Sequence, residues 1–202
     1  DGNKKELFLP TTNIAADSQG YFGFVHPTKT GGSTIERHLF NNYSDYIVGE
    51  GHGNTAASVL ASGKIPIIPI RHPYGRFHSM YTYWRNGGSS GPFLRPKNWK
   101  PVVKTASQFL LKWQNKNSEL LAQMKVGFTW DIHFASYKEW FTKKEWDKAV
   151  VLIYHPSKLS GNFSLLLENL GISPVARKLP VINPSAAKED LNLTKEANEI
   201  LR

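Results

Sequence analysis

Three short runs of apolar residues constrain the fold of this chain most strongly. They cover residues 21–25 (YFGFV), 65–70 (IPIIPI) and 149–154 (AVVLIY), and a weaker run covers residues 46–48. Runs of this length without a polar face are typical of strands buried on both sides of a sheet. Helical patterns separate them, and strands that alternate with helices favour a parallel sheet. We therefore expect an α/β fold of three layers, with a central parallel sheet flanked by helices.

The helical patterns lie between these runs. The spacing of Ile35 and Leu39 predicts a helix through residues 35–42, and Ser33 or Thr34 should lie near its start. Asn54 is the expected N-cap of the next helix. Further helices are expected at residues 55–61, 74–84, 105–124, 159–170 and 194–201. Pro66 and Pro69 disfavour a central strand within the second apolar run.

Length and composition exclude several classes of protein. At about 150 residues per domain, 202 residues predict a single domain over residues 1–202. No apolar run approaches the roughly 18 residues of a membrane span. The lack of cysteine excludes disulfides, thiol catalysis and cysteine-ligated metals. Lys and Arg number 25 against 16 Asp and Glu, and this net charge of +9 favours a polyanionic partner.

A polar, glycine-bearing loop follows the first apolar run. Its sequence is HPTKTGGST, residues 26–34, and it runs directly into a helical pattern. Glycines let backbone N–H groups approach a phosphate, a helix start offers unpaired donors, and a lysine adds a mobile charge. The loop is not a Walker A motif, because Lys29 precedes the glycines. It is suited to hold an anion; the alternative is an ordinary turn before a capped helix.

Residues 21–42 resemble the 5′-phosphosulfate loop of carbohydrate sulfotransferases that use PAPS (3′-phosphoadenosine 5′-phosphosulfate). The resemblance is closest to heparan sulfate 6-O-sulfotransferases, which carry a similar Lys-Thr-Gly-Gly-Thr stretch running into Arg-His-Leu. It implies a P-loop-like fold, PAPS as sulfuryl donor with PAP as product, and no metal. It implies that Lys29 lies beside the oxygen that bridges phosphate and sulfate. The residues that it assigns to the 5′-phosphate are Thr30, Gly31, Gly32, Ser33 and Thr34.

The second apolar run ends in a further motif, RHPYGRFHSMY, residues 71–81. An arginine at a strand end can grip a phosphate through two parallel hydrogen bonds. The motif resembles the 3′-phosphate signature of the same family, Arg-x-Pro-x-x-Arg-[Phe/Tyr]-x-Ser. That resemblance implies that Arg71 and Ser79 bind the 3′-phosphate, while Arg76 braces the helix or is solvated. Both motifs follow strands, so we expect them at the same edge of a parallel sheet.

Transfer to a hydroxyl requires a base that accepts its proton. His52 is our candidate, because it lies in a glycine-flanked loop, GEGHGN, and because histidine titrates near neutral pH. The resemblance places a catalytic histidine of the 6-O group in the corresponding loop, between the two motifs. Glu50 is the alternative base.

Aromatic and basic residues alternate downstream of the second motif. Aromatic faces stack on sugar rings, and Arg and Lys pair with carboxylates or sulfates. The candidate contacts to an acceptor are Trp84, Arg85, Trp99 and His133. The alternative is a core helix with a solvated basic loop, and for His133 a structural histidine. Single-stranded nucleic-acid binders show similar interleaving, but the PAPS motifs favour a carbohydrate acceptor, including an acidic polysaccharide, over nucleic acid.

The sequence is thus compatible with three functions. The first is a PAPS-dependent sulfotransferase acting by in-line transfer. The second is a P-loop kinase relative, against which the missing Gly-Lys-[Ser/Thr] ending and the lack of an evident magnesium-binding aspartate weigh. The third is a non-enzymatic module that binds polyanions. The first residues, DGNKKELF, are typical of a cut end, so we expect the Golgi lumen in a eukaryote after removal of an anchor, and otherwise the cytoplasm.

Overall fold

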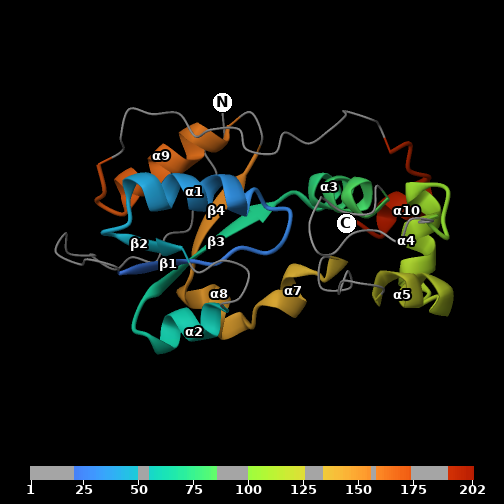
Figure 1. The fold of residues 1–202 in the computed structure, drawn as a ribbon, viewed down its shortest axis with the longest axis horizontal. Coiled ribbons are helices and arrows are strands. Elements are labelled where there is room, and N and C mark those ends of the chain that lie inside the picture. The colour runs from blue at the N-terminus through green and yellow to red at the C-terminus, as the bar shows by residue number, and fades with distance from the viewer. Residues whose placement is uncertain (1–20, 50–54, 86–99, 126–133, 156–157, 174–190) are drawn as a thin grey trace, which may run out of the picture. The chain divides into compact units, whose positions relative to one another are not determined.

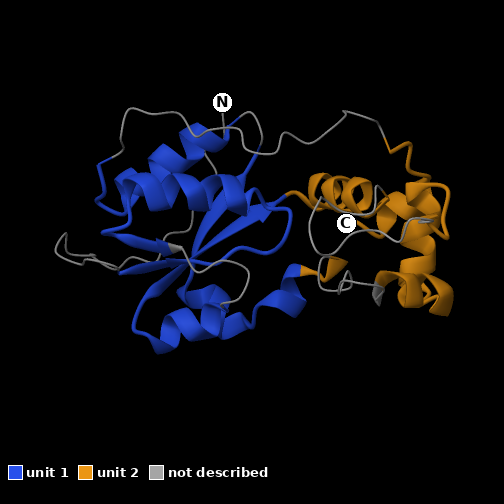
Figure 2. Cartoon of the chain, viewed as in Figure 1, with its two compact units in different colours: residues 1–71, 137–183 blue, residues 72–136, 184–202 orange. Residues whose placement is uncertain are grey.

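The structure is a computed structural model of residues 1–202, and it describes residues 21–49, 55–85, 100–125, 134–155, 158–173 and 191–202. The chain divides into two compact units (Figure 2). Unit 1 consists of Asp1–Arg71 and Tyr137–Asn183, and unit 2 consists of His72–Ser136 and Pro184–Arg202. The single domain over residues 1–202 stays a prediction.

Unit 1 is built on a parallel sheet of four strands, in the order β2-β1-β3-β4. The strands are β1 (Phe22–Phe24), β2 (Ile47–Gly49), β3 (Ile65–Arg71) and β4 (Val150–Tyr154). Each lies on one of the apolar runs, so the predicted central parallel sheet is confirmed. The inner strand β3 carries buried side chains on both faces, as its uninterrupted apolar sequence requires, and β1 buries Phe22 and Phe24 on one face with Gly23 on the other.

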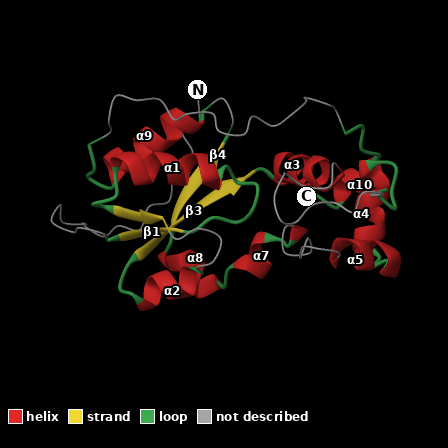
Figure 3. Ribbon diagram, viewed as in Figure 1, coloured by secondary structure: helices red, strands yellow, loops and turns green. Residues whose placement is uncertain are grey.

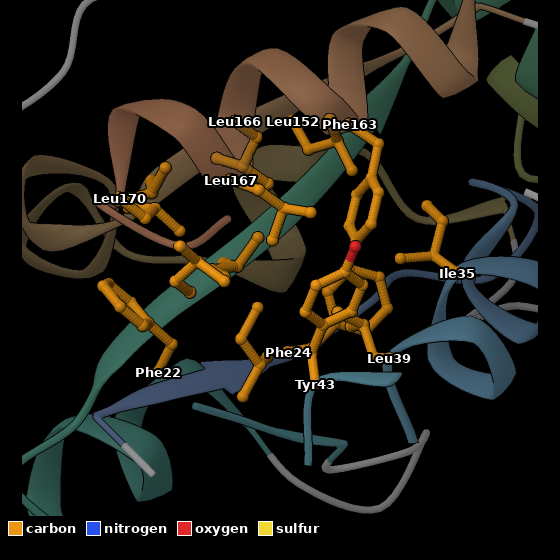
Figure 4. Close-up of a cluster of buried hydrophobic side chains, with 14 of the residues drawn as sticks. Phe22, Phe24, Ile35, Leu39, Tyr43, Leu152, Phe163, Leu166, Leu167 and Leu170 are labelled. Atoms are coloured by element: carbon orange, nitrogen blue, oxygen red, sulfur yellow. The ribbon is translucent and has the colours of Figure 1, made fainter. Parts of the chain in front are cut away.

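Helices cover both faces of this sheet (Figure 1). The helices α1 (Gly32–Asn42) and α9 (Leu159–Asn169) lie on one face, and α2 (Ala56–Ala61) and α8 (Lys143–Lys148) lie on the other. Alternate residues of β3 point to opposite faces of the sheet. Ile67 packs with side chains of α1 and α9, and Ile68 packs with Val59 of α2. Figure 4 shows the first of these layers, in which Phe24, Ile35 and Phe163 meet.

The prolines of β3 determine where the strand pairing stops. The odd-numbered residues of β3 bond to β1, because Ile65 N–H donates to the carbonyl of Tyr21 and Val25 N–H donates to that of Ile67. The next such residue is Pro69, which has no N–H to donate. The register of β1 on β3 accordingly ends at Ile67. The two prolines are thus compatible with an inner strand, and the chain after β1 is released from the sheet as a loop.

The described residues of unit 2 form helices (Figure 3): α3 (Pro73–Arg85), α4 (Ala106–Gln114), α5 (Ser118–Lys125) and α10 (Lys195–Glu199). Trp84 and Phe109 are fully buried at the centre of their core, with ring centroids 4.9 Å apart. Ala197 brings α10 into the same cluster, and Thr194 N–H donates to Ser107 Oγ at 2.9 Å. Unit 2 therefore has a core of its own.

One expectation about helices needs correction. The single helix expected over residues 105–124 is two helices, because Lys116 takes a left-handed backbone (φ 49°) and Asn117 Oδ1 accepts from Leu120 N–H. The helix expected to begin near Ser33 or Thr34 is confirmed, and its first residue is Gly32. The expected cap Asn54 lies outside the described residues; Thr55 is the N-cap of α2, and its hydroxyl accepts from Ser58 N–H.

Candidate anion-binding site

The loop between β1 and α1 is a tight, largely buried turn. The hydroxyl of Thr30 donates to the carbonyl of Pro27 at 2.7 Å, which closes the turn on itself. Lys29 and Gly31 both have left-handed backbones, with φ of 64° and 80°. Such a φ is unfavourable for a lysine, so the surrounding contacts must hold the residue there. The turn aims the chain into α1, whose first residue is Gly32.

The start of α1 offers backbone donors and no competing acid. Thr34 and Ile35 donate to the carbonyl of Gly31. In the described part of the chain, the N–H groups of Gly31, Gly32 and Ser33 have no hydrogen-bond acceptor. No side chain caps this helix and its first turn carries no acidic residue. The positive end of the helix dipole therefore faces the loop together with free donors, which is the arrangement that binds phosphate.

An aromatic ring lies against each glycine of this loop. A Cβ at Gly31 would be 2.2 Å from Cε2 of Tyr154, and a Cβ at Gly32 would be 1.9 Å from Nδ1 of His26. The ring of His26 is buried, and its Nε2 is 3.5 Å from Oε2 of Glu36 on α1. Any larger residue at either glycine would displace a ring, so packing requires glycine at both positions, and the left-handed backbone is a second reason at Gly31 alone.

Arg71, the last residue of β3, lies beside this loop. Its Nη1 donates to the carbonyl of Lys29 at 3.3 Å, and its guanidinium carbon is 5.0 Å from the ring centroid of Tyr154. The hydroxyl of Tyr137, the first residue of α7 (Tyr137–Trp140), accepts from the backbone N–H of Arg71 at 2.7 Å. Among the described residues, Arg71 forms no ion pair with a carboxylate.

The electrostatics of the site favour a bound anion. Burial, and then the charge of Arg71, lower the pKa of Lys29 from 10.5 to about 8. Burial likewise lowers the pKa of Arg71, while Tyr154 and Tyr137 act in the opposite direction. Two cations are thus held close together at a helix start. An anion placed between them would remove their repulsion and replace the water that burial has taken away.

The structure brings most of the predicted phosphate-binding residues together in unit 1. Lys29, the two glycines and Arg71 converge as described, from the loops after β1 and β3. The hydroxyls differ from one another: Thr30 bonds within the loop, Thr34 is buried, and Ser33 is exposed. The backbone therefore supplies the available donors more than the threonine hydroxyls do. Ser79, the expected partner of Arg71, lies on α3 in unit 2 and is half-buried.

Of the residues expected to bind the acceptor, two are described. Trp84 is fully buried in the core of unit 2, so no face of its ring is open to solvent, and a role in acceptor binding stays a prediction. Arg85 is exposed at the end of α3. Arg76 is a brace, since its Nη1 donates to the carbonyl of Ala135 at 2.7 Å. The other candidates lie outside the described residues: His52, Glu50, Trp99 and His133.

Sequence reasoning missed the roles of Tyr154, Tyr137 and His26. His26 begins the glycine-bearing loop but was given no role there, and each of the three acts through the packing of its ring or through a hydroxyl on the backbone. A signal for Tyr154 was nevertheless available. It ends the apolar run of β4, just as Arg71 ends that of β3, and the ends of neighbouring parallel strands lie side by side.

Comparisons with protein-family models, with curated proteins and with solved structures give no significant match to this chain. Within the described ranges, no group of three or more acidic, histidine or cysteine side chains is arranged to hold a metal ion. No helix in the same part of the chain is long and apolar enough to cross a membrane.

Proposed function

We propose that this protein is a sulfotransferase that moves a sulfuryl group from PAPS to a hydroxyl of a carbohydrate, including an acidic polysaccharide. One observation carries the proposal: Lys29 and Arg71 come from two separate motifs, and they meet beside the N–H groups of Gly31 and Gly32, which have no acceptor among the described residues. The chain order and spacing of the two motifs resemble a phosphosulfate loop followed by a 3′-phosphate site. A parallel sheet with its ligand loops at one edge agrees with a P-loop-like fold.

The residues present fit a phosphorylated nucleotide. The N–H groups at the start of α1 and the amine of Lys29 would hold the 5′-phosphosulfate, and Arg71 would hold the 3′-phosphate; the part expected of Ser79, a residue of unit 2, stays a prediction. PAPS supplies the activated sulfuryl group when it is bound. Gly31 and Gly32 have no side chains of their own that could cover the backbone N–H groups, and the space beside each of them is filled by a ring.

The roles of the side chains follow from charge. Lys29 stabilises negative charge that grows on the leaving phosphate, and so acts most strongly in the transition state. His52 takes the proton of the acceptor hydroxyl, with Glu50 as the alternative base. Transfer of this kind needs positioning and electrostatic stabilisation and no covalent intermediate with the protein.

Calorimetry with four ligands tests this function against its alternatives. PAP, 5′-AMP, ATP with magnesium and a sulfated oligosaccharide are each titrated into the intact chain. The proposal expects PAP to bind without magnesium and more tightly than 5′-AMP, and expects Arg71→Ala to remove that preference. A preference for ATP with magnesium would instead support the kinase relative. Binding of the oligosaccharide alone would support the polyanion module.

Lys29→Ala tests the catalytic role directly. We expect it to abolish sulfuryl transfer through a fall in kcat, with a smaller loss of PAP affinity, because its charge matters most as the phosphate departs. The measurement is transfer of radiolabel from PAPS to a panel of polysaccharides, with PAP affinity measured in parallel. Lys64→Ala, a change at another lysine of unit 1, is the control. Near-normal turnover in Lys29→Ala would contradict the role.

A further inference from the structure

Tyr154 contacts both halves of the anion site. Its ring occupies the space beside Gly31, where an added Cβ would be 2.2 Å from Cε2, and the guanidinium of Arg71 lies 5.0 Å from its centroid. The register of β3 on β4 pairs Arg71 with Tyr154 directly. Paired residues on neighbouring strands project from the same face of a sheet, so this contact follows from the strand register.

The side chain of Arg71 has few other restraints. Tyr137 fixes only its backbone, accepting from the N–H at 2.7 Å and donating to the carbonyl at 3.2 Å. Among the described residues the guanidinium has one hydrogen bond, to the Lys29 carbonyl, and no ion pair with a carboxylate. The ring of Tyr154 is therefore the main surface that keeps this charge beside the loop.

We propose that Tyr154 is a positioning residue, which holds the Arg71 guanidinium against the Lys29 loop and so sets the preference of the site for a ligand with a second phosphate. The identity of that ligand rests on the proposed function. The contact between Tyr154 and Arg71 does not depend on it. Tyr154 acts through Arg71 and takes no part in the transfer. The aromatic face is what matters, because the hydroxyl is not needed to attract a cation.

The test compares Tyr154→Leu with Tyr154→Phe, and uses Tyr46→Leu as a control at a partly exposed tyrosine elsewhere in unit 1. We expect Tyr154→Leu to weaken PAP binding roughly 3- to 30-fold, the effect of losing a cation–π contact, and to leave 5′-AMP nearly unchanged. Tyr154→Phe retains the ring and should bind PAP almost as the natural protein does. In an Arg71→Ala background, Tyr154→Leu should have no further effect on PAP.

A second readout is independent of any nucleotide. The pKa of Lys29, followed by NMR of its side chain, should rise from about 8 in Tyr154→Leu, because Arg71 is then free to move away. The pKa of Lys29 should stay unchanged in Tyr154→Phe. In Arg71→Ala, adding Tyr154→Leu should not raise this pKa further. If the natural protein does not bind PAP, the proposed function fails, and this titration alone decides the role of Tyr154.

Some outcomes would overturn the inference. The inference fails if Tyr154→Leu leaves both the preference for PAP and the pKa of Lys29 unchanged. It also fails if Tyr154→Phe weakens PAP binding as much as Tyr154→Leu does. If the leucine variant does not fold, Arg71→Lys provides the second measurement. A lysine keeps the charge but cannot lie flat on the ring while bonding to the Lys29 carbonyl, so it should lose the preference for PAP. An Arg71→Lys variant with the natural preference would then refute the role.

Discussion

Lys29 is the residue whose charge state decides how the site behaves. Its amine is largely buried and is close enough to Arg71 for the two charges to interact, so its pKa falls to about 8. An anion bound at the site favours the protonated amine and would raise that pKa again. The lysine is therefore charged at neutral pH, but it loses its charge at an alkalinity where an ordinary lysine would keep it.

The first prediction concerns the pH dependence of this residue. We expect PAP affinity to fall as the pH rises through about 8, because the neutral amine no longer attracts phosphate. Phosphate itself is fully ionised there, since its second pKa is about 6. Calorimetry between pH 7 and 10 would measure the fall, with Lys29→Arg as the control that does not titrate. The same fall in Lys29→Arg would assign the titration to another group.

The same pKa has a consequence for stability, with a definite sign. The folded state binds the Lys29 proton less tightly than the unfolded state does, so below pH 8 the residue destabilises the fold. This destabilisation is lost as the pH rises from about 8 to 10.5, the value that Lys29 returns to on unfolding. Lys29→Met should be more stable than the natural protein at pH 7, and the difference should shrink towards pH 10.

Gly31 offers a prediction with a matched control. Both Gly31 and Gly63 have left-handed backbones, with φ of 80° and 78°, but only Gly31 has a ring at the place of a Cβ. Gly63→Ala should cost about 1–2 kcal/mol of unfolding free energy, from backbone strain alone. Gly31→Ala should cost more, because Tyr154 must also move, and it should weaken PAP binding. Urea unfolding measures the loss of unfolding free energy, and calorimetry measures PAP binding. Equal losses of unfolding free energy in Gly31→Ala and Gly63→Ala would mean that the Tyr154 ring moves without a cost.

At the scale of elements, helix α9 carries a glycine that the structure does not need. Gly161 lies in the first turn of α9, is exposed, and has no atom within 4 Å of an added Cβ. Gly161→Ala should stabilise the protein by about 0.5–1 kcal/mol, because alanine loses less backbone entropy on folding. Gly171, just beyond α9 at φ 72°, is the control, since alanine there should destabilise. Thermal unfolding of the two variants tests the contrast.

The strands were predictable because short, wholly apolar runs are compatible with few structures other than a buried strand. Apolar runs such as residues 65–70 can be buried on both faces only inside a covered sheet, and even Pro69 proved compatible because pairing with β1 stops before it. The break in the helix expected over residues 105–124 was not predictable, because periodicity continues across it. It depends on the left-handed backbone of Lys116 and the cap supplied by Asn117.

The candidate site was predictable in part, for a similar reason. Lys29 and Arg71 could be brought together from chain order alone, since both follow strands of one parallel sheet. The buried hydroxyls of Thr30 and Thr34 could not be anticipated, because burial depends on how tightly the turn closes. The contact of Tyr154 required the strand register, which sequence patterns do not determine when both faces are apolar.

At the scale of the whole molecule, the two units have separate cores, so a substitution can destabilise the core of one unit and leave the other core unchanged. Ala197 on α10 is fully buried in unit 2, so Ala197→Asp would place a charge in that core. Hydrogen exchange should then show lost protection in α3 and α4, while amides of β1 and β3 stay protected. Asn198→Asp, at the exposed neighbouring position, is the control. Equal loss in both units would mean that the chain unfolds as one.

The register of β3 on β4 has a thermodynamic consequence for ligand binding. A free arginine side chain has rotamer entropy worth about 2 kcal/mol, which a flexible site must give up when it captures an anion. In this fold the pairing of Arg71 with Tyr154 removes much of that freedom when the sheet forms. An anion should therefore bind with a small entropic penalty, and its affinity should fall whenever the last ladder bonds between β3 and β4 fray.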